Sequence, residues 1–474
     1  SMGGVIIGAV PGIGPAIAIA ILLPATVFLD DLVSLVLLLG VYGSSMYGGA
    51  IPAILINTPG TPVNALTTYD GYAMTRRGEA SRALSLAYSA SFIGGCFSIC
   101  MALIALFIFG PYLRDLGALF GQRDIMMAAI LGAVLLIAAH RQTMGIATML
   151  FGFGFLIAMV GRQSTRGIDR FTFGIDYLYS GFNLIVVIIG IFALSQALNL
   201  MVGKDADPPE ARISGGMMRG FKEIARNKII AICSACYGTL MGIIPGVGEF
   251  VAQFFSYSTA RSLSNEPARF GHGSSEGLIA SETSNNAVPA AAMIPLLALG
   301  LPGGALTAMM VAVFQMHDLE PGPLVFYNSP ELIWIVFAAM FYANLSILFV
   351  GLIETKTILY LLKIPFQFLA PMILMLASIG AYISRGLVLD VIVMFIAGII
   401  GFLLRRSGYS IPGIVLGLIL GKIGEQNFAQ GMQMVHYDLG TYFSRPICTI
   451  LIVAGVLTLL KSLHSAFFQK SKAT

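Results

Sequence analysis

The sequence predicts an all-α polytopic membrane protein with about 10–12 transmembrane helices. Re-entrant or broken helices are expected as well, in two related halves of inverted topology. The prediction rests on the scarcity of charge, the length of the apolar runs, and Pro-Gly pairs that recur in the same order. Of the 474 residues, 57% are hydrophobic and 11% are charged. Since a soluble domain carries about 25% charged residues, this chain requires lipid as its solvent. The net charge of +4 gives no reason to expect nucleic-acid binding.

A membrane helix needs about 20 mostly apolar residues. Apolar runs occur at 4–27, 32–56, 83–110, 125–139, 144–160, 182–202, 229–260, 277–316, 331–353, 366–383, 387–404, 409–432 and 447–463. The run 409–432 is marginal, and the longest runs are interrupted by Pro-Gly. The polar stretch 203–228 predicts a cytoplasmic linker between a first half at 1–202 and a second half at 229–474. The start of the chain has no basic stretch or cleavage site typical of a signal peptide.

Neither cysteine nor histidine predicts a metal site or a cofactor. Cys233 and Cys236 have redox spacing, but they lie in an apolar run where small packing residues are expected. The five histidines lack metal-ligand spacing.

Pro-Gly pairs relate the two halves. In corresponding order they are Pro11-Gly12 with Pro245-Gly246, and Pro59-Gly60 with Pro302-Gly303. A further proline, Pro52 or Pro295, precedes the second pair by seven residues in both halves. Two matched pairs in one order predict an internal repeat.

Loop charges indicate that the repeat is inverted. The loop after Pro59-Gly60 is basic and contains Arg76, Arg77 and Arg82. The loop after Pro302-Gly303 is acidic and contains Asp318, Glu320 and Glu331. Asp30 and Asp31 similarly correspond to Arg261 and Arg269. Because basic loops stay in the cytoplasm, corresponding loops face opposite sides, as in an inverted repeat. The loop with Arg162, Arg166 and Arg170 departs from this pattern.

The Pro-Gly pairs predict the substrate site. Broken backbone survives in lipid only where protein or a water-filled cavity surrounds it. The N-terminal end of a half-helix suits a carboxylate, and the carbonyls at a C-terminal end suit Na⁺. The candidate substrate-binding residues near the membrane midplane are Tyr47, Gly48, Gly49, Asn57, Thr58, Pro59, Gly60, Thr61, Ser284, Asn285, Asn286, Gly300, Pro302, Gly303 and Gly304. The alternative is that these breaks are kinks packed by neighbouring helices.

Polar side chains crowd the stretch from Glu276 to Asn286, with no cation nearby. Ionisable groups at membrane depth are usually functional. Glu282 is therefore interpreted as a ligand of a coupling cation, a proton carrier, or a cap of a half-helix N-terminus. Glu249 allows the same interpretations, and the candidate ion-coupling residues are Glu282, Glu249, Asn57 and Asn286. The alternative for this stretch is a solvated loop, which suits 274–276 better than 285–286.

No arginine stands out in the apolar runs as a partner for an anionic substrate. Backbone amides, neutral side chains and a transported Na⁺ or proton are then expected to bind it, which predicts cation-coupled anion uptake. Other classes are a passive anion channel, a non-transporting scaffold subunit, and an enzyme using Glu249 and Glu282 as a carboxylate pair. The sequence shows no evident ring of charged residues of the kind that forms the selectivity filter of a channel. No nucleophile or metal motif accompanies the two glutamates, so an enzyme is not expected.

Several motifs together resemble a known family. They are Pro-Gly-x-Gly-Pro at 11–15, Tyr-Gly-Gly at 47–49, Asn-Thr-Pro-Gly at 57–60, Asp-Gly-Tyr at 70–72, Glu-x-x-Asn-Asn-Ala at 282–287 and Gly-x-Pro-Gly at 300–303. In this order, over nearly the whole chain, they resemble the large membrane subunit of the tripartite tricarboxylate transporter family.

The resemblance implies a multi-pass protein of the bacterial inner membrane. Its partners are a small four-span membrane subunit and a periplasmic substrate-binding protein that delivers citrate or related carboxylates. Coupling is to an ion gradient, in agreement with the lack of a P-loop motif. Compared with the family, the first half has little of the apolar lead-in found at 229–244, so a shortened N-terminus is expected. Ala50 stands where many members carry serine or threonine, which predicts a different substrate range.

Overall fold

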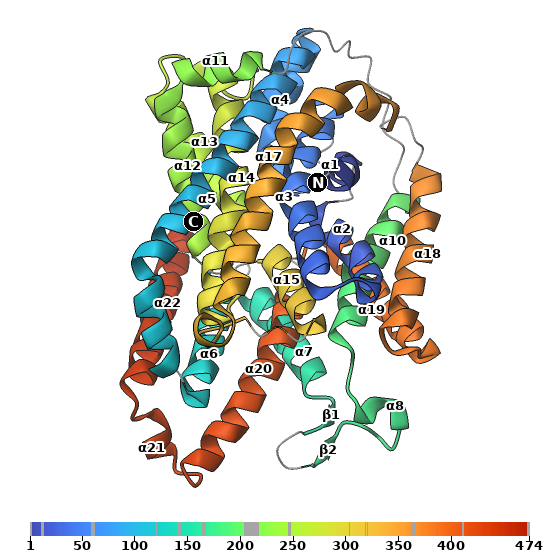
Figure 1. The fold of residues 1–474 in the computed structure, drawn as a ribbon, viewed down its shortest axis with the longest axis vertical. Helices are drawn as coiled ribbons and strands as arrows, with labels where there is room; N and C mark the ends of the chain where they lie inside the picture. The colour runs from blue at the N-terminus through green and yellow to red at the C-terminus, as the bar shows by residue number, and fades with distance from the viewer. Residues whose placement is uncertain are drawn as a thin grey trace.

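The computed structural model is that of an all-α polytopic membrane protein, which confirms the predicted fold class (Figure 1). The structure describes residues 2–10, 14–57, 62–119, 121–139, 144–163, 167–202, 218–244, 248–302, 304–317, 319, 321–361, 366–409 and 412–471. Within these residues, the strands form one antiparallel hairpin of β1 (Gly161–Arg162) and β2 (Asp169–Arg170).

The helices that precede the polar stretch at 203–228 occupy most of the first half. They are α1 (Met2–Ala9), α2 (Pro15–Leu22), η1 (Leu23–Phe28), α3 (Asp31–Ile56), η2 (Pro62–Asn64), α4 (Ala65–Arg76), α5 (Ala80–Leu119), α6 (Gln122–Ala139), α7 (Met144–Ala158), α8 (Asp176–Tyr179), α9 (Leu184–Ile189), η3 (Gly190–Leu194) and α10 (Ser195–Val202). η3 is a turn of π-helix that joins α9 and α10 into one continuous rod.

The first of the remaining helices begins inside that polar stretch, and the others follow it. They are α11 (Arg219–Arg226), α12 (Lys228–Ile243), α13 (Gly248–Leu263), η4 (Pro267–Arg269), α14 (Ser275–Leu299), α15 (Ala305–Met316), α16 (Val325–Asn328), α17 (Pro330–Leu361), α18 (Phe366–Arg385), α19 (Val388–Arg406), α20 (Pro412–Met434), α21 (Leu439–Phe443) and α22 (Pro446–Ser471). Helix ends flank all four Pro-Gly pairs, although most of the residues of these pairs lie outside the described part of the chain.

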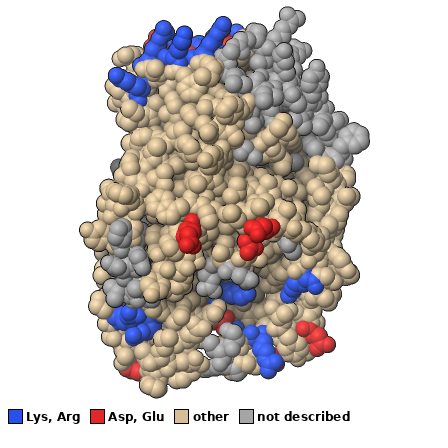
Figure 2. All heavy atoms as spheres, viewed as in Figure 1, with Lys and Arg blue, Asp and Glu red and all other residues tan. Residues whose placement is uncertain are grey.

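Five helical segments in the described residues are long and apolar enough to cross a membrane. They are Asp31–Ile56, Ala80–Gly110, Leu184–Val202, Pro330–Phe349 and Val388–Arg406. Shorter apolar helices accompany them, including Lys228–Ile243 and Met144–Ala158. Large apolar side chains such as Phe107 on α5 and Leu457 on α22 are exposed, as lipid contact requires. Figure 2 shows a broad band without lysine or arginine between basic residues at the two ends of this face.

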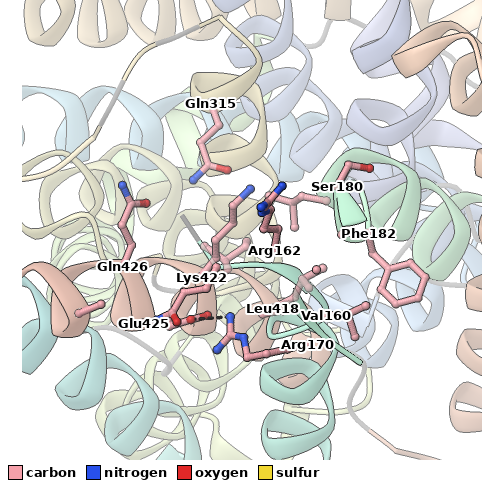
Figure 3. A pocket seen from close by; sticks show the side chains of 17 residues that line it. Val160, Arg162, Arg170, Ser180, Phe182, Gln315, Leu418, Lys422, Glu425 and Gln426 are labelled. Atoms are coloured by element: carbon pink, nitrogen blue, oxygen red, sulfur yellow. Dashed lines mark ion pairs between the residues drawn. The ribbon is translucent and has the colours of Figure 1, made fainter. Parts of the chain in front are cut away.

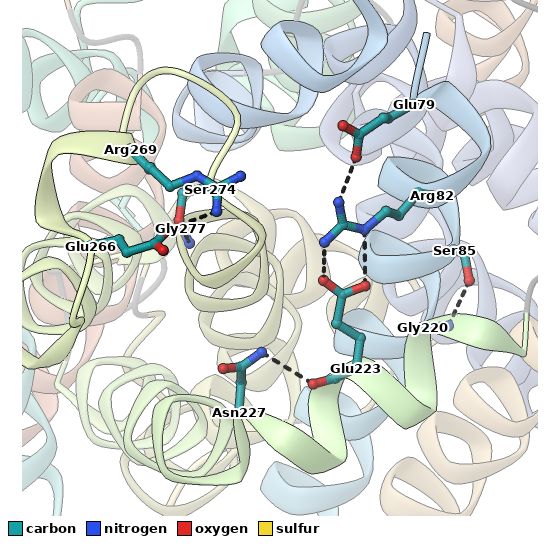
Figure 4. Close-up of polar contacts among 10 residues, drawn as sticks. All are labelled: Glu79, Arg82, Ser85, Gly220, Glu223, Asn227, Glu266, Arg269, Ser274 and Gly277. Carbon is teal, nitrogen blue, oxygen red and sulfur yellow. Dashed lines mark hydrogen bonds and ion pairs between the residues drawn. The ribbon is translucent and has the colours of Figure 1, made fainter. Parts of the chain in front are cut away.

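Part of the predicted polar linker is a helix. Residues 203–217 lie outside the described residues, but α11 lies at one end of the molecule and packs on α5 (Figures 1 and 4). Arg82 donates hydrogen bonds from Nε and Nη2 to the two carboxylate oxygens of Glu223. The amide of Gly220 donates to Ser85 Oγ at 2.7 Å. Burial raises the pKa of Glu223, but the bonds from Arg82 outweigh this effect and lower the pKa below its usual value. The linker is therefore docked against the first half at this point.

Close packing of α5 on α14 depends on glycine. A Cβ at Gly94 would lie 2.2 Å from the carbonyl oxygen of Thr283 on α14, whereas one at Gly110, also on α5, would meet nothing within 4 Å. Small residues allow this approach of helix backbones in membranes. It brings α5 alongside the polar stretch of α14.

We expect Gly94→Ala to lower the free energy of unfolding by about 1–3 kcal/mol, because the added methyl overpacks a backbone contact. The matched Gly110→Ala should be neutral or raise it by about 0.5–1 kcal/mol, since alanine is the better helix former. Thermal unfolding in detergent measures both. Equal effects of the two substitutions would contradict this packing.

Candidate functional site

The polar stretch of the second half lies inside α14 and is buried. Ser281, Glu282, Thr283, Ser284 and Asn285 are each 0% exposed. The helix begins at Ser275, where Ser274 Oγ accepts from the amide of Gly277 at 3.2 Å. Two of the sequence interpretations are therefore wrong. The segment is not a solvated loop, and Glu282 does not cap a helix N-terminus because Ser274 does.

The carboxylate of Glu282 is held by neutral groups from the first half. Thr67 Oγ1 on α4 donates to Glu282 Oε1, and Ser91 Oγ on α5 lies 3.1 Å from Oε2. Asn64 of η2, a few residues beyond Pro59-Gly60, also lies within hydrogen-bonding reach. No ion pair in the described part of the chain involves Glu282. An ionised carboxylate without a cationic partner costs free energy in such buried surroundings. The pocket therefore favours a bound cation or a proton.

Asparagines one turn further along α14 extend the cluster. Asn286 Nδ2 donates to Ser91 Oγ at 2.9 Å and to the carbonyl of Glu282 at 3.1 Å. Within the part of the chain that the structure describes, Oδ1 and Nδ2 of Asn285 are both buried without a hydrogen-bond partner, as are Thr283 Oγ1 and Gln253 Oε1. A buried polar group without a partner costs about 1–3 kcal/mol. These atoms therefore offer bonding capacity to a ligand or to water.

A proline removes the usual intrahelical hydrogen bond of one backbone oxygen in the same turn. Pro289 lies inside α14 and has no N–H to donate to the carbonyl four residues earlier, which is that of Asn285. Asn285 and Asn286 follow Glu282 by three and four residues, so the three share one helix face. A carboxylate, an amide oxygen and a freed carbonyl form a donor set that suits a hard cation such as Na⁺.

Ser284, Gly48 and Tyr47 make contacts that stabilise the packing of the helices. Ser284 Oγ donates to the carbonyl of Ala280 at 2.8 Å within its own helix. Gly48 lies against α1, since a Cβ there would be 2.5 Å from the carbonyl oxygen of Val5. Tyr47 packs edge-on against Tyr88, with ring centroids 5.8 Å apart.

Gly49 connects α3 to the Glu282 cluster. A Cβ at Gly49 would lie 2.4 Å from Asn64 Oδ1, so only glycine lets Asn64 approach α3 this closely. Among the predicted first-half residues that the structure describes, Gly49 is the one that lies next to a partner of Glu282.

Two predicted residues end helices in corresponding ways. Asn57 is the left-handed C-cap of α3 (φ 56°), and Gly300 is the left-handed C-cap of α14 (φ 69°). Gly304 caps the N-terminus of α15, where its amide donates to Thr307 Oγ1 at 2.9 Å. Pro302 is buried, and the remaining predicted residues Thr58, Pro59, Gly60, Thr61 and Gly303 lie outside the described residues.

The predicted residues do not all lie at one place. With a rise of about 1.5 Å per residue, the part of α14 from Glu282 to its C-terminal end measures about 25 Å. A citrate-sized anion cannot contact both Glu282 and Gly300. The structure thus separates the buried polar cluster from the second-half Pro-Gly turn.

Glu249 lies apart from Glu282, in the first turn of α13, where the helix dipole favours a negative charge. Tyr42 on α3 is a neighbouring side chain. Both interpretations of Glu249, ion coupling and helix-end stabilisation, stay predictions.

The substitution Asn57→Gly distinguishes substrate binding by the Asn57 side chain from the role of residue 57 as the left-handed C-cap of α3. Glycine adopts the left-handed conformation without strain, so we expect the free energy of unfolding to change by less than about 0.5 kcal/mol. We expect carboxylate uptake to be lost, because the exposed amide beside the Pro-Gly turn is removed. Uptake by reconstituted vesicles and thermal unfolding measure the two effects. Full uptake by Asn57→Gly would make Asn57 a helix cap alone.

Sequence reasoning missed the first-half partners of Glu282, and it quoted Asp70 only as part of a motif. Asp70 Oδ1 accepts from the amides of Gly271, Gly273 and Ser274 at 2.9, 2.9 and 2.7 Å. Its Oδ2 accepts from the hydroxyl of Tyr257 on α13 at 2.7 Å. Asp70 thus ties α4, which carries Thr67, to the N-terminus of α14, which carries Glu282.

A polytopic helical protein with a buried polar cluster of this kind has the features of a membrane transport protein. The family model of the Tripartite tricarboxylate transporter TctA family matches residues 1–416. The chain belongs to this family, and it is a component of a tripartite tricarboxylate transporter.

Two relatives from Agrobacterium vitis are similar to the chain. One is the "Uncharacterized 52.8 kDa protein in TAR-I ttuC' 3'region", which is 34% identical over 467 residues, 98% of this chain and 92% of the relative. The other is the "Uncharacterized protein in TAR-II ttuC' 3'region", which is 35% identical over 232 residues, 48% of this chain and 96% of the relative. No solved structure matches the chain.

Proposed function

We propose that this protein carries out secondary-active, cation-coupled uptake of small di- or tricarboxylates such as citrate. The observation that carries the proposal is the burial of Glu282, a second-half residue, among neutral donors from the first half of the chain. Such a site holds an excess negative charge unless a cation or proton enters it. Its occupancy therefore depends on the ion gradient.

Two related halves of inverted topology would explain how the site is built. The loop before α14 binds α4 through Asp70 and Ser274. If α3 corresponds to α14 and α15 to α4, the matching contact joins the N-terminus of α3 to the C-terminal end of α15. There Asp31 Oδ1 lies 2.7 Å from His317 Nδ1. The left-handed caps of α3 and α14 also each follow a proline by five residues. These reciprocal features support an inverted repeat with boundaries at 1–202 and 229–474.

The substrate is proposed to bind at the helix ends next to Pro59-Gly60 and Pro302-Gly303. Backbone amides at the start of α15 and in the turn before α4 would face its carboxylates. Glu282, with Asn285 and Asn286, would bind the coupling cation. Since these places lie far apart along α14, coupling would act through a change between two conformations that both ligands bias.

Family membership supports the proposed partners. They are a small four-span membrane subunit and a periplasmic binding protein that delivers the carboxylate. The location is proposed to be the bacterial inner membrane. The basic loop at 76–82 and the docked helix α11 lie at the same end of the molecule, which would be the cytoplasmic end.

The test is uptake by vesicles that contain this protein, its small membrane subunit and the binding protein. We expect saturable uptake of one or more carboxylates from a panel, dependent on the binding protein. Non-saturable flux that ignores the binding protein would indicate a channel. No flux with any carboxylate would indicate a scaffold.

A further inference from the structure

Two adjoining cavities lie between α20 and its neighbours, away from the Glu282 cluster. One has a volume of about 620 Å³ and reaches Gly300, at the C-terminal end of α14. The other has a volume of about 190 Å³ and is closed on one side by the β1–β2 hairpin (Figure 3). Gln315, Lys422 and Gln426 line both cavities. These three side chains therefore stand where the two spaces meet.

Among the described residues, the charge on the walls is mainly positive. Lys422 takes part in no ion pair within the described residues. Arg162 lies 3.7 Å from Asp169, an exposed and distant pairing, and Arg170 binds Glu425 at 2.5 Å. Glu425 is thus the acidic residue on the wall of the smaller cavity, against Lys422 and two arginines. Figure 3 shows Lys422 and Arg162 directed toward the same space.

Further donors surround this positive charge. Nε of Arg170 is buried and has no hydrogen-bond partner among the described residues. The larger cavity is lined by the side-chain amides of Gln122, Gln315, Gln426, Asn427 and Gln430. Lys422, Gln426 and Gln430 lie four residues apart on α20, so they form one polar stripe along its face. Cations combined with neutral amide donors suit an anion that carries several carboxylates.

We propose that Lys422, with Gln315 and Gln426, forms a second binding station for a small di- or tricarboxylate. The inference rests on the proposed carboxylate transport, and it differs from the expectation that binding uses no cationic side chain. A cavity of about 620 Å³ lies within the range of small-molecule sites. Its contact with Gly300 links the station to the second-half Pro-Gly turn. The substrate would reach that turn from the end of the molecule that carries the β1–β2 hairpin.

The test is equilibrium binding of radiolabelled citrate, and separately succinate, to the purified protein in lipid nanodiscs. We expect Lys422→Gln to weaken citrate binding roughly tenfold or more, since a charge-assisted hydrogen bond is lost. Lys422→Arg should keep most of the affinity. The matched control is Lys228→Gln, an exposed lysine at the start of α12 outside both cavities, which should bind as the unaltered protein does.

Unchanged binding by Lys422→Gln would overturn the inference, as would an equal loss in Lys228→Gln. Competition by sulfate as strong as by succinate would also overturn it, because the station would then select charge alone. Uptake by the same variants distinguishes this outcome from a failure of the proposed function. If Lys422→Gln binds and transports normally while Glu282→Gln does not transport, the station fails and carboxylate transport stands. If the unaltered protein takes up no carboxylate, the proposed function fails.

Discussion

Replacement of Glu282 by glutamine is expected to abolish gradient-driven uptake while the protein still folds. Glutamine fills nearly the same volume; its amide oxygen can still accept from Thr67, and its NH2 group can donate to Ser91 Oγ, so packing is kept. It removes the negative charge, however, and a hydrogen bond to a charged group contributes about 1.5–3 kcal/mol. Cation affinity should therefore fall by roughly 10- to 100-fold. Uptake at a fixed cation gradient, and cation dependence of binding, are the measurements.

Glu276→Gln is the matched control for this substitution. Glu276 lies in the first turn of the same helix and is only half-buried. We expect its uptake to stay within about twofold of the unaltered protein, as for a surface change without a buried charge. Normal ion dependence in Glu282→Gln would exclude Glu282 as the coupling group.

Loss of the Asp70 carboxylate is expected to have the largest effect on stability. Asp70→Ala leaves three backbone amides and the hydroxyl of Tyr257 without their acceptor. Removal of one partner from a buried charged network costs about 3–5 kcal/mol. Uptake should fall as well, because α4 then loses its tie to the start of α14. Thermal unfolding in detergent and vesicle uptake are the two readouts.

Asp176→Ala, at an exposed position on α8, is the control for Asp70→Ala. It should change the free energy of unfolding by less than about 0.5 kcal/mol. If Asp70→Ala unfolds at the same temperature as this control, the clamp between α4 and α14 does not stabilise the protein.

Local sequence patterns predicted what depends on composition and on nearby residues. The scarcity of charge predicted a membrane protein, and prolines and glycines predicted where helices end. The polar stretch around Glu282 was recognised as unusual because six consecutive polar residues at 281–286 interrupt an apolar run. Its helical state was left open, since asparagine and serine favour helix ends as well as interiors.

The partners of Glu282 depended on long-range packing that no local pattern carries. Ser91 lies in a stretch of small residues on α5, and its approach to α14 depends on Gly94. Thr67 and Asn64 reach the carboxylate because α4 and η2 pack against α14. Asn57 was predicted as a ligand from its residue type, whereas its left-handed backbone gives it a second role as a helix cap.

Lys422 was missed for a different reason. It lies in the run 409–432, which was judged only by its marginal hydropathy. A signal was present, since Lys422, Gln426 and Gln430 recur every four residues and predict a polar stripe on a helix. Only the structure places this stripe opposite Gln315 and the basic hairpin.

The separation of the two polar places has a mechanistic consequence. A cation at Glu282 and a carboxylate at the far end of α14 cannot neutralise each other directly across about 25 Å of helix. In the proposed function, each would instead stabilise the same conformation of the chain. Helix α14 touches α4, α5, α12 and α13, so its position is sensitive to changes in either half.

Uptake under imposed gradients tests the central claim most directly. Vesicles with this protein, its membrane subunit and a loaded binding protein are given an inward Na⁺ gradient, an inward proton gradient, or neither. The proposed function requires carboxylate to accumulate with one of the two gradients, and Glu282→Gln to remove that dependence. Equal uptake after both gradients are collapsed would contradict cation coupling.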